Sequence, residues 1–251
     1  MLLPFYNLTL YTYPWNIQKH IFGIEENNYN ITNNILKINY PKDSYSPSKN
    51  PVGGIGFYAK PRNIQNSSHI VFSYSVSFDT TFNPNLGGKL PGMFISNNYT
   101  KTLNGASGGK HTNNTSCRIA WRSDFQAEAY LYLPKNIQQH SSYYQDAKIN
   151  NIYGDSLWRG DLYFDKSTWN NITIEMRLNT FDNTSPNQDG LLKLSINNNT
   201  KIIDTLIWTL DPFSKIETII FESFFGGSTI KTATPNDNWT FFKNVSIEKI
   251  K

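Results

Sequence analysis

The feature that most constrains the fold of this chain is a two-residue alternation of apolar and polar side chains. Between residues 71 and 78, every second residue from Phe72 to Phe78 is apolar, and serines occupy positions between them. Residues 171–178 repeat the pattern with Ile, Ile, Met and Leu. Because successive side chains of a strand point to opposite faces, each segment is predicted to be a strand with one buried face.

Further strands are predicted along most of the chain, and helical periodicity is nearly absent. Gly, Pro, Asn and Asp cluster between the strands, as at residues 83–85 and 187–190, and these clusters are typical of turns. Many short strands with regular turns indicate an all-β antiparallel sandwich or jelly roll, with a concave sheet to bind substrate. The other predicted strands are 35–40, 117–122, 128–133, 191–197, 218–225 and 240–247.

No repeat, linker or change of composition divides the 251 residues, so we expect one domain, 1–251, in which 1–30 form an N-terminal extension. No apolar run approaches the roughly 20 residues of a membrane span. Lys and Arg are scattered, with a net charge of +4, which argues against a nucleic-acid partner and suits an acidic polysaccharide. We expect a monomer.

The single cysteine, Cys117, excludes an internal disulfide. The N-terminus is too short and too soon polar for a secretory signal. Asn-x-Ser/Thr sequons are nevertheless frequent, although the high asparagine content produces some of them by accident. The sequons slightly favour an extracellular, glycosylated protein. They include Asn7, Asn30, Asn66, Asn98, Asn114, Asn171, Asn198, Asn238 and Asn244.

Two neighbouring strands carry an unusual polar face. Alternation over 116–122 and 128–133 directs Ile119, Trp121 and Leu131 to the core and a polar row to the other side. A short connection indicates a hairpin, so both polar rows are expected to line one solvent-facing groove. An ordinary solvated strand surface would give the same pattern. The polar set consists of Ser116, Arg118, Arg122, Glu128, Tyr130 and Tyr132.

A glycine-rich segment precedes these strands. In Gly-Gly-Lys-Leu-Pro-Gly at residues 87–92, the glycines permit close approach of the backbone to a ligand, and the proline restricts where Lys89 points. By itself the segment is more typical of a turn with an exposed lysine.

Together these motifs resemble polysaccharide lyase family 14, which includes alginate and glucuronate lyases of chlorella viruses and molluscs. The resemblance rests on Gly-Lys-Leu-Pro-Gly at 88–92, Ser-Cys-Arg at 116–118 and Glu-Ala-Tyr-Leu-Tyr-Leu-Pro at 128–134. It extends over roughly residues 36–247, and the first 30 or so residues lie outside it. Further landmarks are 40–47, 53–54, 169–170 and 224–227.

The resemblance implies a jelly roll whose concave sheet cleaves a uronate polymer by β-elimination. Lys89, Arg118, Tyr130 and Tyr132 match the family's catalytic positions, and Ser116 matches a substrate-binding one. We also expect Arg122 and Glu128, on the same face, to contact substrate. The stretch 111–115 departs from the family's pattern, which puts the identity of the uronate in doubt.

Elimination requires neutralisation of the uronate carboxylate, a base at C5 and an acid at the glycosidic oxygen. Arg118 suits the first role, and either Tyr130 or Lys89 suits the base. A tyrosine suits the acid. No cofactor or metal is expected, because the four histidines lack metal-ligand spacing.

Two other functions remain open. A glycoside hydrolase would need two carboxylates flanking the scissile bond, for which Glu128, Glu175 and Glu222 are candidates. A lectin-like binding module would use the same arginines and tyrosines without needing Lys89.

Overall fold

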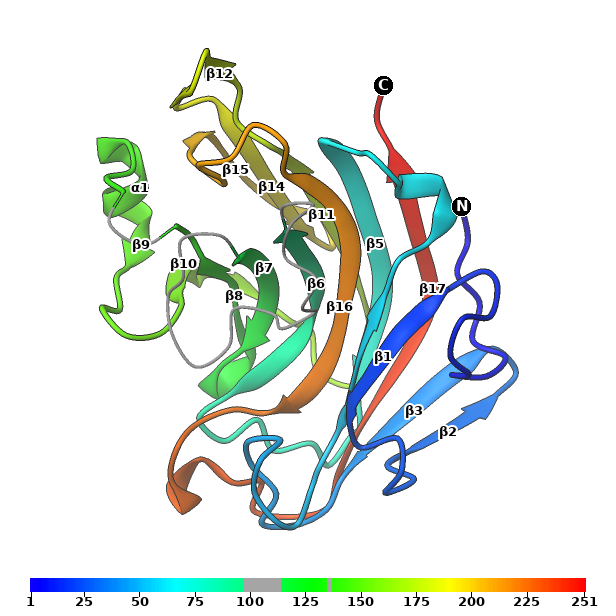
Figure 1. The fold of residues 1–251 in the computed structure, drawn as a ribbon. Coiled ribbons are helices and arrows are strands. Elements are labelled where there is room, and N and C mark those ends of the chain that lie inside the picture. Colours follow the sequence, from blue (N-terminus) through cyan, green and yellow to red (C-terminus); the bar gives the residue numbers. More distant parts are fainter. Residues whose placement is uncertain (97–113, 135–136) are drawn as a thin grey trace.

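The computed structural model describes residues 1–96, 114–134 and 137–251, and in them two large antiparallel sheets pack face to face (Figure 1). One sheet has the order β1 (Ile17–Phe22), β4 (Ile55–Ala59), β16 (Lys215–Phe225), β6 (Gly88–Ser96), β7 (Asn114–Trp121), β8 (Gln126–Tyr132), β10 (Asp155–Tyr163) and β9 (Ala147–Lys148). The other has the order β15 (Asn199–Leu206), β14 (Gly190–Ile196), β11 (Trp169–Arg177), β5 (His69–Phe78), β17 (Asn238–Lys249), β3 (Ile35–Tyr40) and β2 (Tyr29–Thr32). The predicted antiparallel sandwich is confirmed.

The remaining elements are short. Strands β12 (Phe181–Asp182) and β13 (Ser185–Pro186) form a ribbon, and α1 (Ser141–Asp146) follows β8. Three 3-10 turns are Arg62–Ile64, Ser123–Phe125 and Ile230–Thr232. None of the helices in the described ranges is long and apolar enough to cross a membrane.

The predicted alternation is what builds the core between the sheets. On β5, Phe72, Val76 and Phe78 are buried, and on β11 Ile172 and Ile174 meet them from the neighbouring strand. Each segment predicted as a strand coincides with an observed one, with ends that differ by a few residues. Burial of one face per strand therefore drives the packing of the two sheets.

Within the described residues, nine of the observed strands were not predicted, and four of these, β4, β6, β10 and β15, lack clean alternation. Strand β4 is buried along its whole length, so both of its faces are apolar. Strand β6 contains glycines and Pro91, yet it lies inside the sheet between β16 and β7. Its register with β7 shifts between Leu90 and Gly92, and this bulge accommodates a proline that has no N–H to donate. Strands β10 and β15 were also missed; both contain register irregularities.

An aromatic cluster supports the underside of the eight-stranded sheet. The Trp121 ring, at the end of β7, has edge contacts with Tyr40, Phe78, Phe82 and Phe225 at centroid distances of 5.3–6.1 Å. Because Trp121 is fully buried, as predicted, β7 is anchored on its core side directly beneath its polar side.

The N-terminal extension packs on the same core. Leu3, Phe5 and Trp15 are at most 2% exposed, and the Phe5 ring stacks on Trp15 at 5.3 Å. The Leu3 N–H donates to the carbonyl of Val245, so the segment is tied to β17.

Candidate active site

The register between β7 and β8 brings the predicted residues onto one face of the sheet. Arg118 pairs with Tyr130 across the two strands, and Ser116 pairs with Tyr132. Ala120 pairs with Lys89 of β6 on its other side, so the lysine joins the same face. Residues paired in this way project to the same side, so three neighbouring strands supply the site.

The predicted solvent-facing row is only partly realised. Tyr130 and Arg122 are half-buried, whereas Arg118 and Tyr132 are 2% and 3% exposed, so the prediction of solvent exposure is wrong for these two. The Arg118 guanidinium carbon lies 5.9 Å from the ring centroid of Tyr130 and 5.5 Å from that of Tyr132. The aromatic rings therefore cover the arginine, which alternation alone does not reveal.

Lys89 is held against Tyr130 by the shape of β6. A Cβ at the preceding Gly88 would lie 2.1 Å from the Trp121 ring, so only glycine allows the strand to pass this close. The Lys89 Nζ lies 3.7 Å from the ring centroid of Tyr130. Burial lowers the pKa of Lys89 well below 10.5, and the charge of Arg122 lowers it further, which favours a neutral amine.

Burial shifts the pKa of Tyr130 in the opposite direction. The rings of Tyr130 and Tyr132 meet edge to face at 5.6 Å, and the Tyr130 hydroxyl accepts a hydrogen bond from the Gly154 N–H at 3.2 Å. Burial raises the pKa of Tyr130 above 10.0, and Tyr132 adds to the rise, against a smaller opposing effect of Arg118. Tyr130 is therefore a protonated phenol at neutral pH.

Arg118 is paired with a carboxylate that the sequence did not connect to it. Its Nη1 donates to Oε2 of Glu222 on β16 at 2.7 Å, and both side chains are buried. Burial alone would lower the pKa of Arg118, but the charge and hydrogen bond of Glu222 raise it, so the guanidinium stays charged.

Ser116 is the one buried hydroxyl of the predicted set that lacks a hydrogen-bond partner within the described residues. Ser116 is 0% exposed, and on β7 it pairs with Tyr132 of β8. A buried hydroxyl without a partner costs stability, so the group is suited to a ligand.

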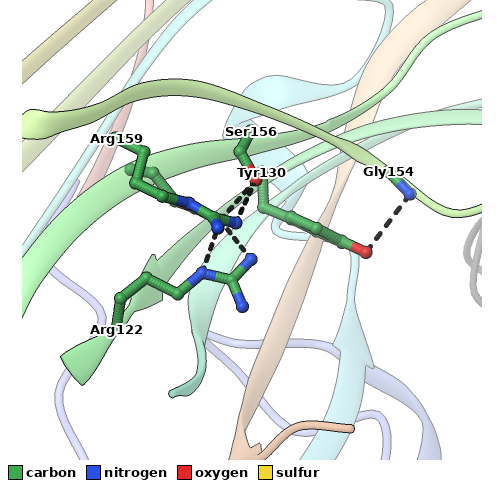
Figure 2. Close-up of polar contacts among 6 residues, drawn as sticks. Arg122, Tyr130, Gly154, Ser156 and Arg159 are labelled. Carbon is green, nitrogen blue, oxygen red and sulfur yellow. Dashed lines mark hydrogen bonds and ion pairs between the residues drawn. The ribbon is translucent and has the colours of Figure 1, made fainter. Parts of the chain in front are cut away.

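Glu128 lies beneath the site rather than in it. Its side chain is 0% exposed, and it accepts hydrogen bonds from Arg122 at 2.9 and 2.5 Å, from Arg159 at 2.5 Å and from Ser156 at 3.0 Å. Its three partners are labelled in Figure 2. Burial alone would raise its pKa, but the hydrogen bonds from Arg122 and Arg159 and the charges of Arg122 and Lys89 lower it below 4.5. This burial argues against the direct substrate contact that we predicted for Glu128.

Arg159 and Ser156 were not predicted from the sequence. They lie on β10, where Ser156 pairs with Tyr130 and the register then slips after Leu157. Trp158 has a positive φ of 64°, which breaks the two-residue alternation at this point. No periodic signal could therefore have directed Arg159 toward Glu128.

The remaining candidates lie apart from this site. Glu175, on the other sheet, bonds His69 at 2.9 Å, so it cannot pair with Glu222 as a hydrolase would require. His111 lies outside the described residues. Within those that are described, no group of three His, Cys, Asp or Glu could hold a metal ion.

Three comparisons relate the chain to known proteins. Exolysin of Paramecium bursaria Chlorella virus 1 is 26% identical over 205 residues, which cover 73% of this chain and 30% of that protein. The chain thus spans less than a third of the length of this relative. The PL-14 alginate lyase of Aplysia kurodai superposes with a TM-score of 0.81 and 28% identity, over 93% of this chain and 90% of that one.

An alginate lyase from Chlorella virus has the same fold, with a TM-score of 0.78 and 23% identity over 94% of this chain and 93% of that one. The family model Polysaccharide lyase 14 matches residues 28–245, a range that contains every residue of the candidate site. The chain therefore belongs to polysaccharide lyase family 14.

Proposed function

We propose that the chain cleaves a uronate-containing acidic polysaccharide, of the alginate or glucuronan type, by β-elimination. The observation that carries the proposal is the contact of Lys89, with its lowered pKa, and Tyr130, with its raised pKa, beside the charged Arg118. Family membership and the similarity to an alginate lyase of Aplysia kurodai support the same chemistry.

Arg118 would bind the carboxylate of the uronate that is cleaved. An ionised carboxylate makes the neighbouring C5–H a very poor acid, and a charge-assisted hydrogen bond offsets this by stabilising the developing negative charge. Ser116, with its unpartnered hydroxyl, would donate to the same carboxylate. Glu222 keeps Arg118 charged and in place before substrate arrives.

Lys89 would act as the base and Tyr130 as the acid. The neutral Lys89 amine takes the C5 proton, the electron pair forms the C4–C5 double bond, and the C4–O bond breaks. Tyr130 gives its hydroxyl proton to the departing oxygen. Transfer of the proton from the Lys89 ammonium to the phenolate then restores both groups. Tyr132, packed edge to face on Tyr130, would hold that ring in position.

The sequence left the choice of base open between Lys89 and Tyr130, and the proposed base is Lys89. Burial disfavours the charged form of each group, so it makes the lysine a base and keeps the tyrosine an acid. The reaction as written needs no cofactor. We propose an extracellular monomer that acts on an acidic polysaccharide. Glycosylation would have to spare Asn238, whose side chain is fully buried and donates to Thr234 at 2.5 Å.

The test is incubation with several polyuronates, with ultraviolet absorbance of the unsaturated product as the readout. Lys89→Ala and Arg118→Ala should each lower turnover about 100-fold or more, a size typical of losing an acid–base or charge-stabilising group. Lys243→Ala, on the other sheet, is the matched control and should keep the activity of the parent. Near-normal turnover in both site variants would overturn the assignment. Binding without cleavage by the parent would favour the lectin-like function instead.

A further inference from the structure

We propose that Arg122 and Arg159 form a second carboxylate-binding subsite, which takes the uronate next to the one held by Arg118. The inference rests on the proposed lyase function and adds to it a requirement for two neighbouring acidic sugars. It assigns a binding role to Arg159, which no feature of the sequence pointed to.

The charges of the cluster around Glu128 do not balance. Two guanidiniums share one buried carboxylate, because Glu128 accepts from Arg122 through Oε1 and from Arg159 through Oε2. Ser156, which donates to Glu128 at 3.0 Å and accepts from Arg159 Nη2 at 2.5 Å, is neutral. The cluster therefore keeps an excess of one positive charge. A single arginine could have satisfied Glu128 in a bidentate pair, so the second cation needs another explanation.

Both arginines are partly exposed to solvent. The side chains of Arg122 and Arg159 are 21% and 29% exposed, while Glu128 beneath them is 0% exposed. A guanidinium offers five N–H donors, and both arginines bond Glu128 through Nε and Nη2. The Nη1 group of each has no hydrogen-bond partner in the described part of the chain. The Nε and Nη2 edge of each guanidinium is thus fixed by Glu128, and the Nη1 group remains available to an anion.

The two arginines also lie close to the residues of the proposed active site. The Arg122 guanidinium carbon lies 5.8 Å from the ring centroid of Tyr130, and that of Arg118 lies 5.9 Å from the same centroid. Ser156 accepts a hydrogen bond from Arg159, and on β10 it pairs with Tyr130 of the neighbouring strand β8. Figure 2 shows Arg122 and Arg159 converging beside the Tyr130 ring. In a polymer of linked uronates each sugar carries a carboxylate, so the proposed subsite would take the carboxylate of a sugar next to the reacting one.

Two oriented guanidiniums suit a carboxylate better than scattered surface charges would. Planar guanidiniums that are already oriented lose little conformational freedom when they bind a carboxylate with two parallel bonds. Glu128 and Ser156 provide that orientation in the free protein. The subsite would accordingly lower KM for a polymer with adjacent carboxylates, without taking part in proton transfer.

The experiment compares the parent with Arg159→Gln and, as a matched control on the other sheet, the exposed Arg177→Gln. Two substrates are used: a polyuronate that the parent cleaves, and the same polymer with part of its carboxylates reduced to primary alcohols. KM and kcat are measured on the plateau of each protein's pH profile. Arg159→Gln retains an amide that can still donate to Glu128.

On the full polymer, Arg159→Gln should raise KM about tenfold, the size of one lost charge-assisted hydrogen bond, and leave kcat within about twofold. On the reduced polymer, its KM should approach that of the parent. Arg159→Lys keeps the charge but not the planar guanidinium, so its KM on the full polymer should lie between those of the parent and Arg159→Gln. Arg177→Gln should match the parent on both polymers.

An unchanged KM in Arg159→Gln, or an equal rise on both polymers, would overturn the subsite. A loss of kcat with lowered Tm would also overturn it, because a purely structural support for Glu128 predicts that result. If the parent cleaves no polyuronate, the proposed lyase function fails instead. Calorimetric binding of the intact polyuronate to the parent and to Arg159→Gln then tests the subsite alone: weaker binding supports it and equal binding overturns it.

Discussion

At the scale of single residues, one physical cause acts in opposite directions on two groups in contact. Burial penalises whichever form of a group is charged, so it lowers the pKa of Lys89 and raises the pKa of Tyr130. A lysine that is neutral near working pH is a competent base, and a phenol that stays protonated is a competent acid. In the proposed mechanism, the same buried face thus supplies both proton-transfer groups.

The pH dependence of kcat/KM tests this pairing. In the proposed mechanism Lys89 acts without its proton, so kcat/KM should rise with pH through a limb that lies well below 10.5. Tyr130 must keep its proton, and its raised pKa should delay any fall to strongly alkaline pH. The measurement is kcat/KM against pH at fixed ionic strength for the parent, Lys89→Arg and Tyr130→Phe.

Each variant has a distinct expected profile. Lys89→Arg should remove or displace the rising limb, and Tyr130→Phe should lower kcat/KM while the limb keeps its position. His111→Ala is the control and should reproduce the parent. A limb that disappears in His111→Ala would transfer the base role to that histidine, and one that disappears in Tyr130→Phe would transfer it to the tyrosine.

Glu128 contributes to stability through the two arginines above it. Glu128→Gln should lower the free energy of unfolding by about 3 kcal/mol, because removing one partner leaves the positive charges uncompensated. Its folded pKa is lowered, so this contribution is present above about pH 4.5 and is lost as the pH falls through the lower folded value.

Denaturant unfolding between neutral and acid pH measures both effects. Glu175→Gln, which loses only a half-buried pair with His69, is the matched control and should cost about 0–1 kcal/mol. Equal losses in the two variants would show that the buried cluster has no special stabilising role.

At the scale of elements, close approach between β6 and β7 sets the site geometry. A Cβ at Gly92 would lie 1.9 Å from the Cys117 carbonyl oxygen and 2.7 Å from the Cα of Arg118. Gly92→Ala should therefore push β6 away from β7, at a cost of about 1–3 kcal/mol, and should reduce kcat by displacing Lys89 from Tyr130.

Thermal unfolding and kcat together check the Gly92 variant. Gly160→Ala is a useful control: a Cβ there would find its nearest neighbour 4.0 Å away, although its positive φ of 93° adds backbone strain. If both variants lose stability but only Gly92→Ala loses kcat, the result would support the role of the close β6–β7 contact in positioning Lys89. Normal kcat in Gly92→Ala would contradict it.

A strand could be predicted from the sequence where one of its faces is polar and the other apolar. The β7–β8 hairpin was predicted because alternation separates Arg118 and Tyr130 from Ile119 and Leu131. Strand β6 was missed because Pro91 and its glycines also fit a turn, and only pairing on both sides makes it a strand. The partners Glu222 and Arg159 come from strands distant in sequence, and local periodicity carries no information on such pairings.

At the scale of the whole molecule, the site depends on the core between the two sheets. The polar face of β7 lies directly above the aromatic cluster that surrounds Trp121, to which both sheets contribute: Phe78 comes from the seven-stranded sheet and Phe225 from the eight-stranded one. The eight-stranded sheet is curved, as β16 shows in Figure 1. Large aromatic rings pack against the side of this sheet that faces the core.

Trp121→Ala tests this dependence. Removing a fully buried indole should lower the free energy of unfolding by about 3–5 kcal/mol, through lost burial and the cavity left among the rings. The indole also donates to the Pro84 carbonyl at 3.2 Å, a bond that alanine cannot make. Because the cavity lies beneath Gly88, kcat should fall as Lys89 loses its support. Trp239→Ala, a half-buried tryptophan on β17 that packs under Lys37, is the matched control and should cost less and leave kcat unchanged. Comparable losses of stability in the two variants would contradict the view that the core beneath β7 supports the site.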